Sequence, residues 1–431
     1  MANMLDLITK LRGTDAHATQ LFNLFADHMR ESFGACAMAL ICTEGLAYNQ
    51  FRILWFSDEQ GRQIIDELNF SAMPQAAILR RGEDLSTLLD PSQPVIRQCT
   101  EHGIDPMFGD LFKKYIDVIS LPLLQHDGVH RWLLMLYAES GRVDQIDLER
   151  GLEIATLAIN YVYSVEAAQR LAEANAWIKS ELEAIGRIQQ LLLPQDLSDT
   201  PGIEVARLFQ PHAYVGGDYY EIVPLSTARG PDHQDADPGV WGFMIADASG
   251  HGAAAAVEIA MFDAVLRTYK PAGVAEPGDV LNYANRYFFT RMLRGSFITA
   301  FVSKYDPPTG ILTYANAGHP RPFVKRAGST ELATLERCVG MPLGVDRRAH
   351  WDSVRVSMAI GDLLIMYTDG ITEARSSGGQ AFGLERLRAV IADAPQEPQA
   401  CMASIQRAVT DHLAGMPAND DQTLLVVQIT D

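Results

Sequence analysis

The sequence has few of the features that extracellular, membrane-spanning and nucleic-acid-binding proteins need. Its 431 residues include only five cysteines, widely spaced and without a CxxC pair, which is evidence against a disulfide framework or a zinc knot. No apolar run reaches the roughly 18 residues of a membrane span, and the N-terminus does not resemble a signal peptide. The 35 basic residues are outnumbered by 54 acidic ones, which leaves no basic footprint for nucleic acid. We therefore expect a cytoplasmic protein whose partners are neither membranes nor nucleic acids.

The chain is too long for one ordinary hydrophobic core, so two or three domains are expected. With 48% hydrophobic and 21% charged residues, its composition is that of a globular protein. Changes in the hydrophobic pattern divide it into residues 1–165, 166–196 and 197–431.

Residues 1–165 are predicted to form a small α/β domain. Helical periodicity covers Ala18–Phe33, and a second, long helix begins at Gln145. Between them lie four short strand-like runs, Cys36–Ile41, Phe51–Trp55, Val118–Leu124 and Trp132–Tyr137. The turn His126-Asp127-Gly128 joins the last two as a hairpin. This order resembles a GAF-type sensory domain, most clearly from Asp127 to Val165. The resemblance implies that an unidentified small ligand or protein signal acts there.

A helical linker is predicted over residues 166–196. Positions that alternate by three and four residues form an a/d seam, namely Ala168, Leu171, Asn175, Ile178, Leu182, Ile185, Gln189 and Leu192. Pro194 then ends the helix. Polar residues at the a positions Asn175 and Gln189 are typical of parallel dimers, so residues 166–193 predict a parallel homodimeric coiled coil. The alternative is an amphipathic helix packed on its own domain.

Residues 197–431 combine many strands with separate helices. The strand-like runs are Glu204–Phe209, Trp241–Ala246, Ile298–Lys304, Ile311–Ala315, Ser353–Met358, Asp362–Tyr367 and Leu424–Ile429. The helical stretches are Ala253–Tyr269, Gly278–Leu293, Leu384–Ala392 and Pro398–Leu413. Ser226–Pro238 reads as a polar loop. This order indicates a layered α+β fold and not a doubly wound sheet.

Four aspartate groups in this region point to a metal site. Asp218 ends VGGD, Asp247 opens DASGHG, Asp369 lies in YTDG, and Asp420 and Asp421 lie in NDDQT. Three of the groups border apolar strands and three are flanked by glycine. Carboxylate and carbonyl oxygens are the ligands that Mg²⁺ and Mn²⁺ prefer, and no HExxH indicates zinc. Each aspartate alone would be an ordinary turn residue, and spacing does not show that they converge.

Eight ordered blocks extend this pattern. They are IQQLLLP at 188–194 followed by VGGDYYE, DASGHG, SFITAF, YANAGHP, GMPLGV, GDLLIMYTDG and NDDQT. In this order, over residues 185–431, they resemble the PPM family of protein phosphatase 2C-like serine/threonine phosphatases, in its SpoIIE/RsbU branch. The resemblance implies an α-β-β-α sandwich with two divalent cations, Mn²⁺ or Mg²⁺, at one end.

The resemblance also assigns the metal ligands. Asp218 would bind one cation, Asp247 would bridge both, and the backbone carbonyl of Ala248 would add a ligand. Asp369 would bind near the bridge and Asp420 would complete the other shell. Cations about 3.5–4 Å apart share a water and lower its pKa, and that water attacks phosphorus in line.

Other residues are expected beside these ligands. Gly217, Glu221 and Asp421 would support them from just outside, and Glu221 stands where the branch usually has aspartate. His251 is either a general acid for the leaving serine oxygen or a structural residue of a glycine turn. Gly250 and Gly252 are expected to adopt positive φ.

What holds the substrate phosphate is left open. Eukaryotic relatives have an arginine five positions before the first metal aspartate, where this chain has Ala213. Arg207 is a weak candidate, since a solvated strand residue is the commoner case.

The resemblance implies a serine/threonine phosphoprotein phosphatase under control of the N-terminal domain. Its implied substrate is a phosphoserine on a STAS-type anti-sigma-factor antagonist. One alternative is a non-catalytic docking module, although such a copy would usually lack one of the four aspartates. The other is a phosphatase for a small phosphorylated molecule, which the regulatory architecture disfavours. Nothing in the sequence indicates whether the signal raises or lowers activity.

Overall fold

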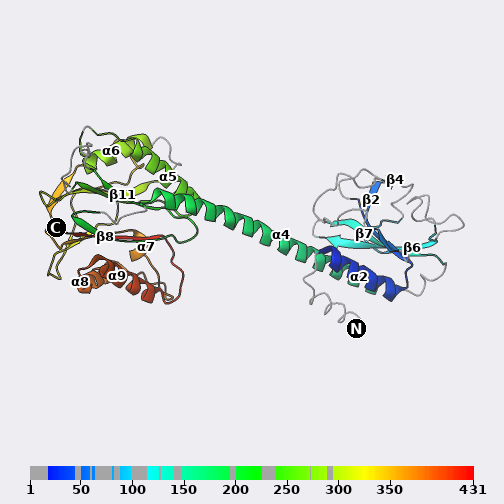
Figure 1. The fold of residues 1–431 in the computed structure, drawn as a ribbon. Coiled ribbons are helices and arrows are strands. Elements are labelled where there is room, and N and C mark those ends of the chain that lie inside the picture. Colours follow the sequence, from blue (N-terminus) through cyan, green and yellow to red (C-terminus); the bar gives the residue numbers. More distant parts are fainter. Residues whose placement is uncertain are drawn as a thin grey trace. The chain divides into compact units, whose positions relative to one another are not determined.

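The computed structural model describes residues 18–43, 50–58, 61–63, 80–81, 88–98, 114–125, 128–139, 147–194, 200–225, 239–271, 273–288 and 295–431. The chain folds into two compact units, Met1–Asn175 and Ala176–Asp431 (Figure 1). The predicted turn residues His126 and Asp127 and the predicted loop Ser226–Pro238 lie outside the described residues. None of the helices in the described part of the chain combines the length and apolarity that a bilayer span requires.

The first unit contains one sheet packed against helices. Its strands are β1 Ala37–Cys42, β2 Gln50–Asp58, β3 Gly61–Gln63, β4 Arg80–Arg81, β5 Val95–Gln98, β6 Asp117–Gln125 and β7 Gly128–Tyr137. They run in the order β3-β2-β1-β7-β6-β5, with β4 beside β2. The helix α2 (Ala18–Phe33) has the predicted bounds, and β6 and β7 pair antiparallel as the predicted hairpin requires. The GAF-type assignment stays a prediction.

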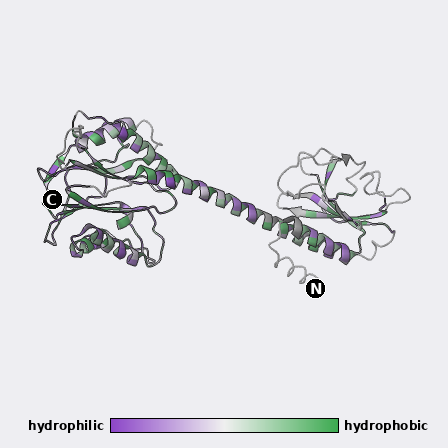
Figure 2. Ribbon diagram, viewed as in Figure 1, coloured by the Kyte–Doolittle hydropathy of each residue, from purple (hydrophilic) through white to green (hydrophobic). Residues whose placement is uncertain are grey.

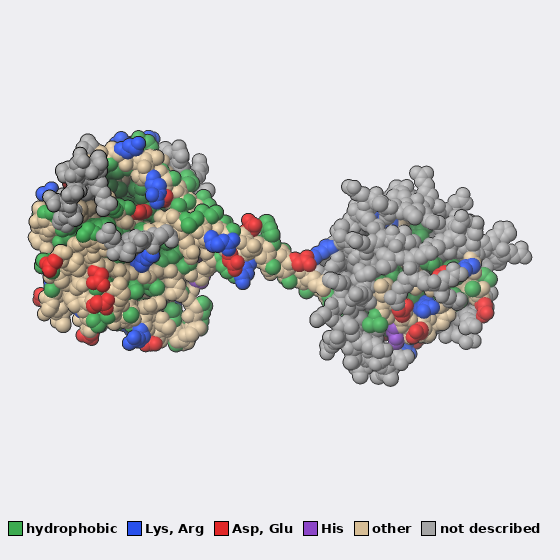
Figure 3. All heavy atoms as spheres, viewed as in Figure 1, with side chains coloured by type: hydrophobic (Ala, Val, Ile, Leu, Met, Phe, Trp, Pro, Cys, Tyr) green, Lys and Arg blue, Asp and Glu red, His purple; other side chains and the backbone are tan. Residues whose placement is uncertain are grey.

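The helix α4 (Leu148–Leu192) is continuous over 45 residues and includes most of the predicted linker. It carries hydrophilic and hydrophobic residues along its whole length (Figure 2). Near its middle, Leu171 and Ile178 of the predicted seam are 62% and 48% exposed, and apolar side chains lie among charged ones there (Figure 3). Gln189, predicted on the same seam, is instead buried in the second unit. The second unit therefore uses the C-terminal end of the seam for its own packing.

Two sheets pack face to face in the second unit. The first comprises β9 Asp218–Pro224, β10 Trp241–Ala248, β11 Ile298–Asp306, β12 Ile311–Ala317, β15 Val339–Gly340 and β16 Val354–Ser357. The second comprises β8 Ile203–Gln210, β13 Phe323–Lys325, β14 Leu332–Thr334, β17 Leu363–Tyr367 and β18 Gln422–Ile429. Side chains from both sheets share one core, as Ile245 and Phe301 do with Leu364 and Val427.

Helices form the outer layers of this unit. On the first sheet lie α5 (Ala253–Arg267) and α6 (Pro277–Phe288), and on the second lie α8 (Leu384–Asp393) and α9 (Pro398–Leu413) (Figure 1). The short helix α7 (Asp369–Thr372) was not predicted. The bounds of α9 match the prediction because Pro398 favours the first turn and Glu397 accepts hydrogen bonds from its free N–H groups. The layers follow the predicted α-β-β-α order.

Candidate metal centre

Two of the predicted aspartates face each other across adjacent strands. Asp218 is the first residue of β9 and lies directly opposite Asp247, near the end of β10. Side chains at such paired positions point to the same face of a sheet, about 5 Å apart at Cβ. The antiparallel pairing of β9 with β10 therefore brings together carboxylates that are 29 positions apart in the sequence.

Two threonines of the second sheet hold Asp218 in place. The Oδ2 atom of Asp218 accepts hydrogen bonds from Thr368 Oγ1 at 2.8 Å and from Thr423 Oγ1 at 2.6 Å. Thr368 precedes Asp369 at the end of β17, and Thr423 lies at the start of β18. Neither threonine was predicted as a site residue, although both lie in the sequence blocks YTDG and NDDQT. They connect the segments that carry the remaining aspartates to Asp218.

Asp420 and Asp421 differ in what their carboxylates do. Asp421 is buried, and it accepts backbone hydrogen bonds at 2.6 Å from His212 N–H and Gly217 N–H, one on each oxygen. Asp420 is partly exposed and accepts one hydrogen bond, from the backbone N–H of Asp421 at 2.9 Å. Because both oxygens of Asp421 already hold the loop before Asp218, Asp420 has the greater capacity to bind a metal ion. This difference favours the prediction that Asp420 is a metal ligand and that Asp421 supports the ligands.

Burial and mutual repulsion raise the pKa values of these acids. Burial, followed by the charges of Asp218, Asp369, Asp420 and Asp421, raises the pKa of Asp247 to about 9. Burial, followed by the charge of Asp420, raises the pKa of Asp369 to about 6. Burial also raises the pKa of Asp218 well above its ordinary value. The four charged groups that act most strongly on Asp247 are all aspartates. The cluster therefore lacks compensating positive charge, which divalent cations would provide.

The acidic side chains are not arranged as a closed metal-binding site. Among the residues that the structure describes, no group of three or more His, Cys, Asp or Glu side chains is arranged to hold a metal ion. The donor types still fit a hard cation, because carboxylates and the Ala248 carbonyl come from neighbouring strand ends. The assignment of Asp218, Asp247, Ala248, Asp369 and Asp420 as metal ligands accordingly stays a prediction.

Glycines allow the loops of the centre to approach one another. A Cβ on Gly217 would lie 2.8 Å from the carbonyl oxygen of Ala248, and one on Gly370 would lie 1.9 Å from that of Asp421. Gly250 and Gly252 have φ values of +91° and +79°, which confirms the prediction of positive φ. The loop close to Ala248 therefore depends on glycine for its backbone conformation.

The Glu221 side chain contacts residues other than the aspartates. Its carboxylate accepts a hydrogen bond from Tyr219 OH and lies 3.9 Å from Arg267 on α5. Asp218 instead bonds to threonines of the second sheet. Glu221 is three positions after Asp218, and an odd spacing in a strand puts two side chains on opposite faces of the sheet. Glu221 therefore faces α5 and not Asp218, and its predicted role in support of the metal ligands stays a prediction.

The histidines and arginine near the centre have distinct surroundings. His251 is exposed, and its ring centroid lies 6.2 Å from that of His212, edge to face. His212 was not predicted as a site residue, because it lies outside the eight sequence blocks. Arg207 donates hydrogen bonds to the Pro194 carbonyl and, at 3.0 Å, to Tyr220 OH. Its guanidinium is thus engaged within the unit, whereas the two imidazoles are exposed.

The end of α4 packs against the loop before Asp218. Gln189 Nε2 donates to the Gly216 carbonyl at 2.8 Å, and Gln189 Oε1 accepts from the Gly216 N–H at 3.1 Å. Gly186 allows this approach, since a Cβ there would lie 2.3 Å from the Tyr214 carbonyl oxygen. The linker helix is therefore bonded directly to the loop that carries a predicted metal ligand.

Gln189→Ala is expected to destabilise the second unit and to weaken metal binding. The change leaves a buried N–H and a buried C=O without partners, which costs about 2 kcal/mol. We expect a melting temperature lower by several degrees in calorimetry, and a weaker Mn²⁺ affinity in titration calorimetry. Gln190→Ala, at the exposed neighbouring position, is the control. Equal effects from the two variants would contradict a specific role for Gln189.

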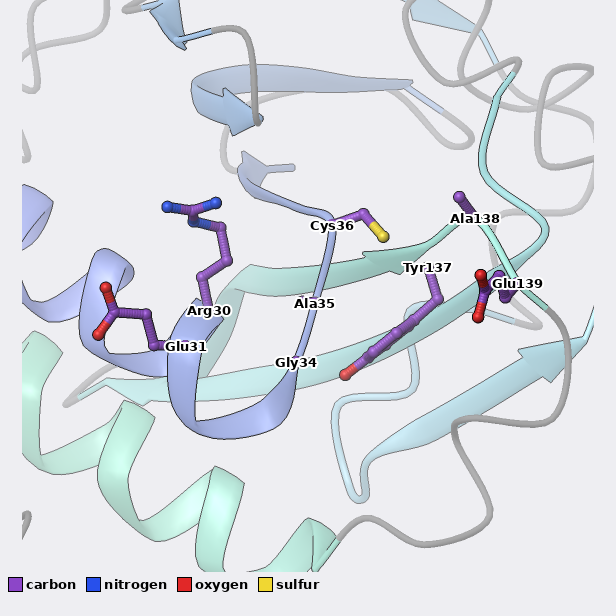
Figure 4. A pocket seen from close by; sticks show the side chains of 8 residues that line it. All are labelled: Arg30, Glu31, Gly34, Ala35, Cys36, Tyr137, Ala138 and Glu139. Carbon is purple, nitrogen blue, oxygen red and sulfur yellow. The ribbon is translucent and has the colours of Figure 1, made fainter.

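The first unit contains a cavity. Its volume is about 470 Å³, and Arg30 and Glu31 of α2 line it together with Cys36, Tyr137 and Glu139 (Figure 4). Tyr137 OH donates a hydrogen bond to the Phe33 carbonyl at 3.2 Å. The aspartates predicted to carry the chemistry all lie in the second unit.

Comparisons with known proteins match part of the second unit. Residues 237–430 match the family model for stage II sporulation protein E (SpoIIE). The chain is 27% identical over 221 residues to phosphoserine phosphatase RsbU of Bacillus subtilis, and 26% identical over 275 residues to protein IcfG of Synechocystis. These matches cover 51% and 57% of this chain, but only 62% and 41% of the two relatives.

A solved structure resembles the fold. The SiaA-PP2C domain of Pseudomonas aeruginosa superposes with a TM-score of 0.50 at 21% identity, over 60% of this chain and 99% of that domain. At this identity the likeness concerns the fold. The second unit thus has the fold of a PP2C domain, and residues 237–430 within it match the SpoIIE family model.

Proposed function

We propose that the chain is a metal-dependent serine/threonine phosphoprotein phosphatase. The observation that carries the proposal is the convergence of acidic segments from both sheets of the second unit. Asp218 and Asp247 face each other on the first sheet, and Thr368 and Thr423 bond Asp218 to the segments holding Asp369 and Asp420. The name of the relative RsbU, a phosphoserine phosphatase, supports the same reaction.

Each acidic residue has a role in this proposal. Asp218, Asp247, Asp369, Asp420 and the Ala248 carbonyl hold two divalent cations, Mn²⁺ or Mg²⁺. When bound, the cations supply an activated water and offset charge on the phosphoryl oxygens. Burial, followed by the charges of the neighbouring aspartates, raises the pKa of Asp247 to about 9, and bound cations would favour its ionised form.

The exposed imidazoles complete the site. His251 and His212 lie edge to face on loops that border the aspartates, and the backbone of His212 is anchored on Asp421. We assign them to binding the phosphoryl group and protonating the leaving serine oxygen. This assignment replaces the arginine that is absent at Ala213.

The proposed substrate is a phosphoserine on a STAS-type regulatory protein in a partner-switching pathway. The match to an RsbU-type relative supports it. The docking-module alternative would be expected to lack one of the aspartates, yet all four are present. A small phosphorylated molecule is the other alternative, and substrate comparison distinguishes it.

Metal removal tests the catalytic proposal. Purified protein should hydrolyse p-nitrophenyl phosphate with Mn²⁺, and EDTA should abolish the reaction, because the activated water and the charge compensation are lost. A phosphorylated STAS-type protein and free phosphoserine should be assayed in parallel. Activity that is undiminished in EDTA would rule out the two-metal mechanism. Faster turnover of free phosphoserine would favour the small-molecule alternative.

We also propose that the middle of α4 forms a parallel dimer that relays signals from the first unit. The exposed seam residues Leu171 and Ile178 support it. Light scattering should give a dimer for the full chain and a monomer for Leu171→Glu/Ile178→Glu. Glu173→Lys, at an outward heptad position, is the control. A wild-type monomer at high concentration would contradict the dimer.

A further inference from the structure

A cavity of about 590 Å³ lies in the second unit, on the face of the first sheet that α5 and α6 cover. It is distinct from the acidic centre. Its strand residues include the pair Val223 and Gly242, five positions along β9 and β10 from the pair Asp218 and Asp247. Five strand residues correspond to roughly 17 Å. The lining also extends along β9 to Tyr219, which follows Asp218 directly but points to the opposite face of the sheet.

The walls of this cavity are largely apolar. Val223, Met244 and Val302 line it from the sheet, and Leu266 and Val280 line it from the helices. The three sheet residues lie on neighbouring strands, with Met244 directly opposite Val302. Sites for small organic molecules usually enclose about 300–1,000 Å³ with mostly apolar walls. Its size and lining thus suit a small ligand with an apolar body.

Five charged side chains line the cavity, and Lys304 among them is paired with Glu276, 2.8 Å away. Three are basic, Arg267, Lys270 and Lys304, and two are acidic, Glu221 and Asp263. Arg267 Nε lies 2.7 Å from Asp263 Oδ2. Lys270 is exposed, and no described carboxylate forms a salt bridge with it. The group that this rim would attract in a ligand is accordingly an anion.

A hydrogen-bonded link beside the cavity joins the two segments that border the acidic centre. Tyr219 OH bonds to Glu221 on its own strand and to Asp263 on α5, the latter at 2.8 Å. Tyr219 follows Asp218 directly, and a short loop joins the end of β10, which contains Asp247, to α5. A ligand that moves α5 relative to β9 would therefore alter the spacing of these aspartates.

We propose that this cavity is a regulatory site for an amphiphilic anion, a molecule with an apolar body and one carboxylate, sulfonate or phosphate group. Its body packs between α5, α6 and the sheet, and its anionic group lies at Lys270 and Arg267. Occupancy changes the affinity of the acidic centre for divalent cations through the Tyr219 link, and metal binding changes ligand affinity by the same factor.

Fluorescence titration of the full chain tests the site without any assay of activity. The probe is 8-anilinonaphthalene-1-sulfonate, an aromatic sulfonate whose emission rises in apolar surroundings. Decanoate should displace it, whereas decyltrimethylammonium, with the opposite charge, should not. Val280→Trp, which fills the cavity, should abolish displaceable binding. Lys270→Glu should weaken it at least fivefold, and Arg347→Glu, an exposed charge reversal elsewhere on the unit, should leave it unchanged.

Two results would overturn the proposal. Unchanged decanoate-displaceable binding in Lys270→Glu and Val280→Trp would place the probe elsewhere. If Val280→Trp does not fold, the location of the probe is judged from Lys270→Glu alone. Lys270 is exposed, so its substitution should leave the fold intact. The coupling is tested by titrating Mn²⁺ with and without decanoate, where we expect at least a threefold change in Kd that Tyr219→Phe removes. An unchanged Kd in the wild type would refute regulation. Because no readout is catalytic, failure of the proposed phosphatase activity would remain a separate result.

Discussion

Asp247→Asn is expected to lower kcat/KM for p-nitrophenyl phosphate with Mn²⁺ by at least about 10³-fold, equivalent to about 4 kcal/mol of transition-state stabilisation. Asp247 lies opposite Asp218, and the other four aspartates are the charges that act on it most strongly. An amide at this position keeps the shape of the side chain but removes the negative charge with which Asp247 would hold divalent cations.

The control for this variant is Asp393→Asn, an exposed aspartate at the end of α8. It should retain full activity, and circular dichroism should show that both variants are folded. Asp421→Asn separates support from metal binding, because the Asp421 oxygens accept backbone N–H groups of His212 and Gly217. Asp421→Asn should lower the melting temperature, because it weakens the hold on these N–H groups. Turnover at saturating Mn²⁺ should fall much less than it does in Asp247→Asn. A fully active Asp247→Asn enzyme would remove this residue from the site.

The metal-free protein should lose stability as pH rises from about 4 to 9. The pKa of Asp247 is about 9 in the folded protein and near 3.8 when unfolded, so the folded state holds this proton more tightly. The stabilisation that results from this tighter proton binding is fully present below pH 3.8 and is lost progressively as pH approaches 9. Asp369, with a pKa of about 6, adds an effect of the same sign between about pH 4 and 6. Bound cations favour the ionised carboxylates and should remove this loss of stability.

Calorimetry in EDTA at pH 5.5 and pH 8.5 measures this effect. We expect a melting temperature several degrees lower at pH 8.5, since 1 kcal/mol corresponds to roughly 2–4 °C for a domain of this size. Saturating Mn²⁺ should remove the difference. Asp247→Asn should melt above the wild type in EDTA at pH 8.5, although it is inactive. A metal-free wild type that is more stable at pH 8.5 would refute the proposed repulsion among the acids.

Local signals in the sequence determined much of the fold of the second unit. Hydrophobic periodicity and helix-start residues located α9 at its observed bounds, and the runs around β10 and β18 were correct to within two residues at each end. Such signals depend on neighbours along the chain, so a single sequence contains them. The aspartates were found in the same way, through the glycines and strand residues beside them.

Pairings between distant segments could not be predicted. The strand β8 lies beside β18 although more than 200 positions separate them, and Asp218 is fixed by Thr368 and Thr423. Gln189 had the spacing of a coiled-coil seam, yet it is buried against the Gly216 backbone. Glu221 lies in the same sequence block as Asp218, yet its side chain faces α5.

The sequence by itself thus determined which acidic residues are candidates for a metal site and which elements carry them. Only the tertiary structure decided which of those residues meet. The physical reason is that helix and strand preferences act over a few residues, whereas contacts such as that of Asp421 with His212 arise when sheets pack and buried polar groups find partners.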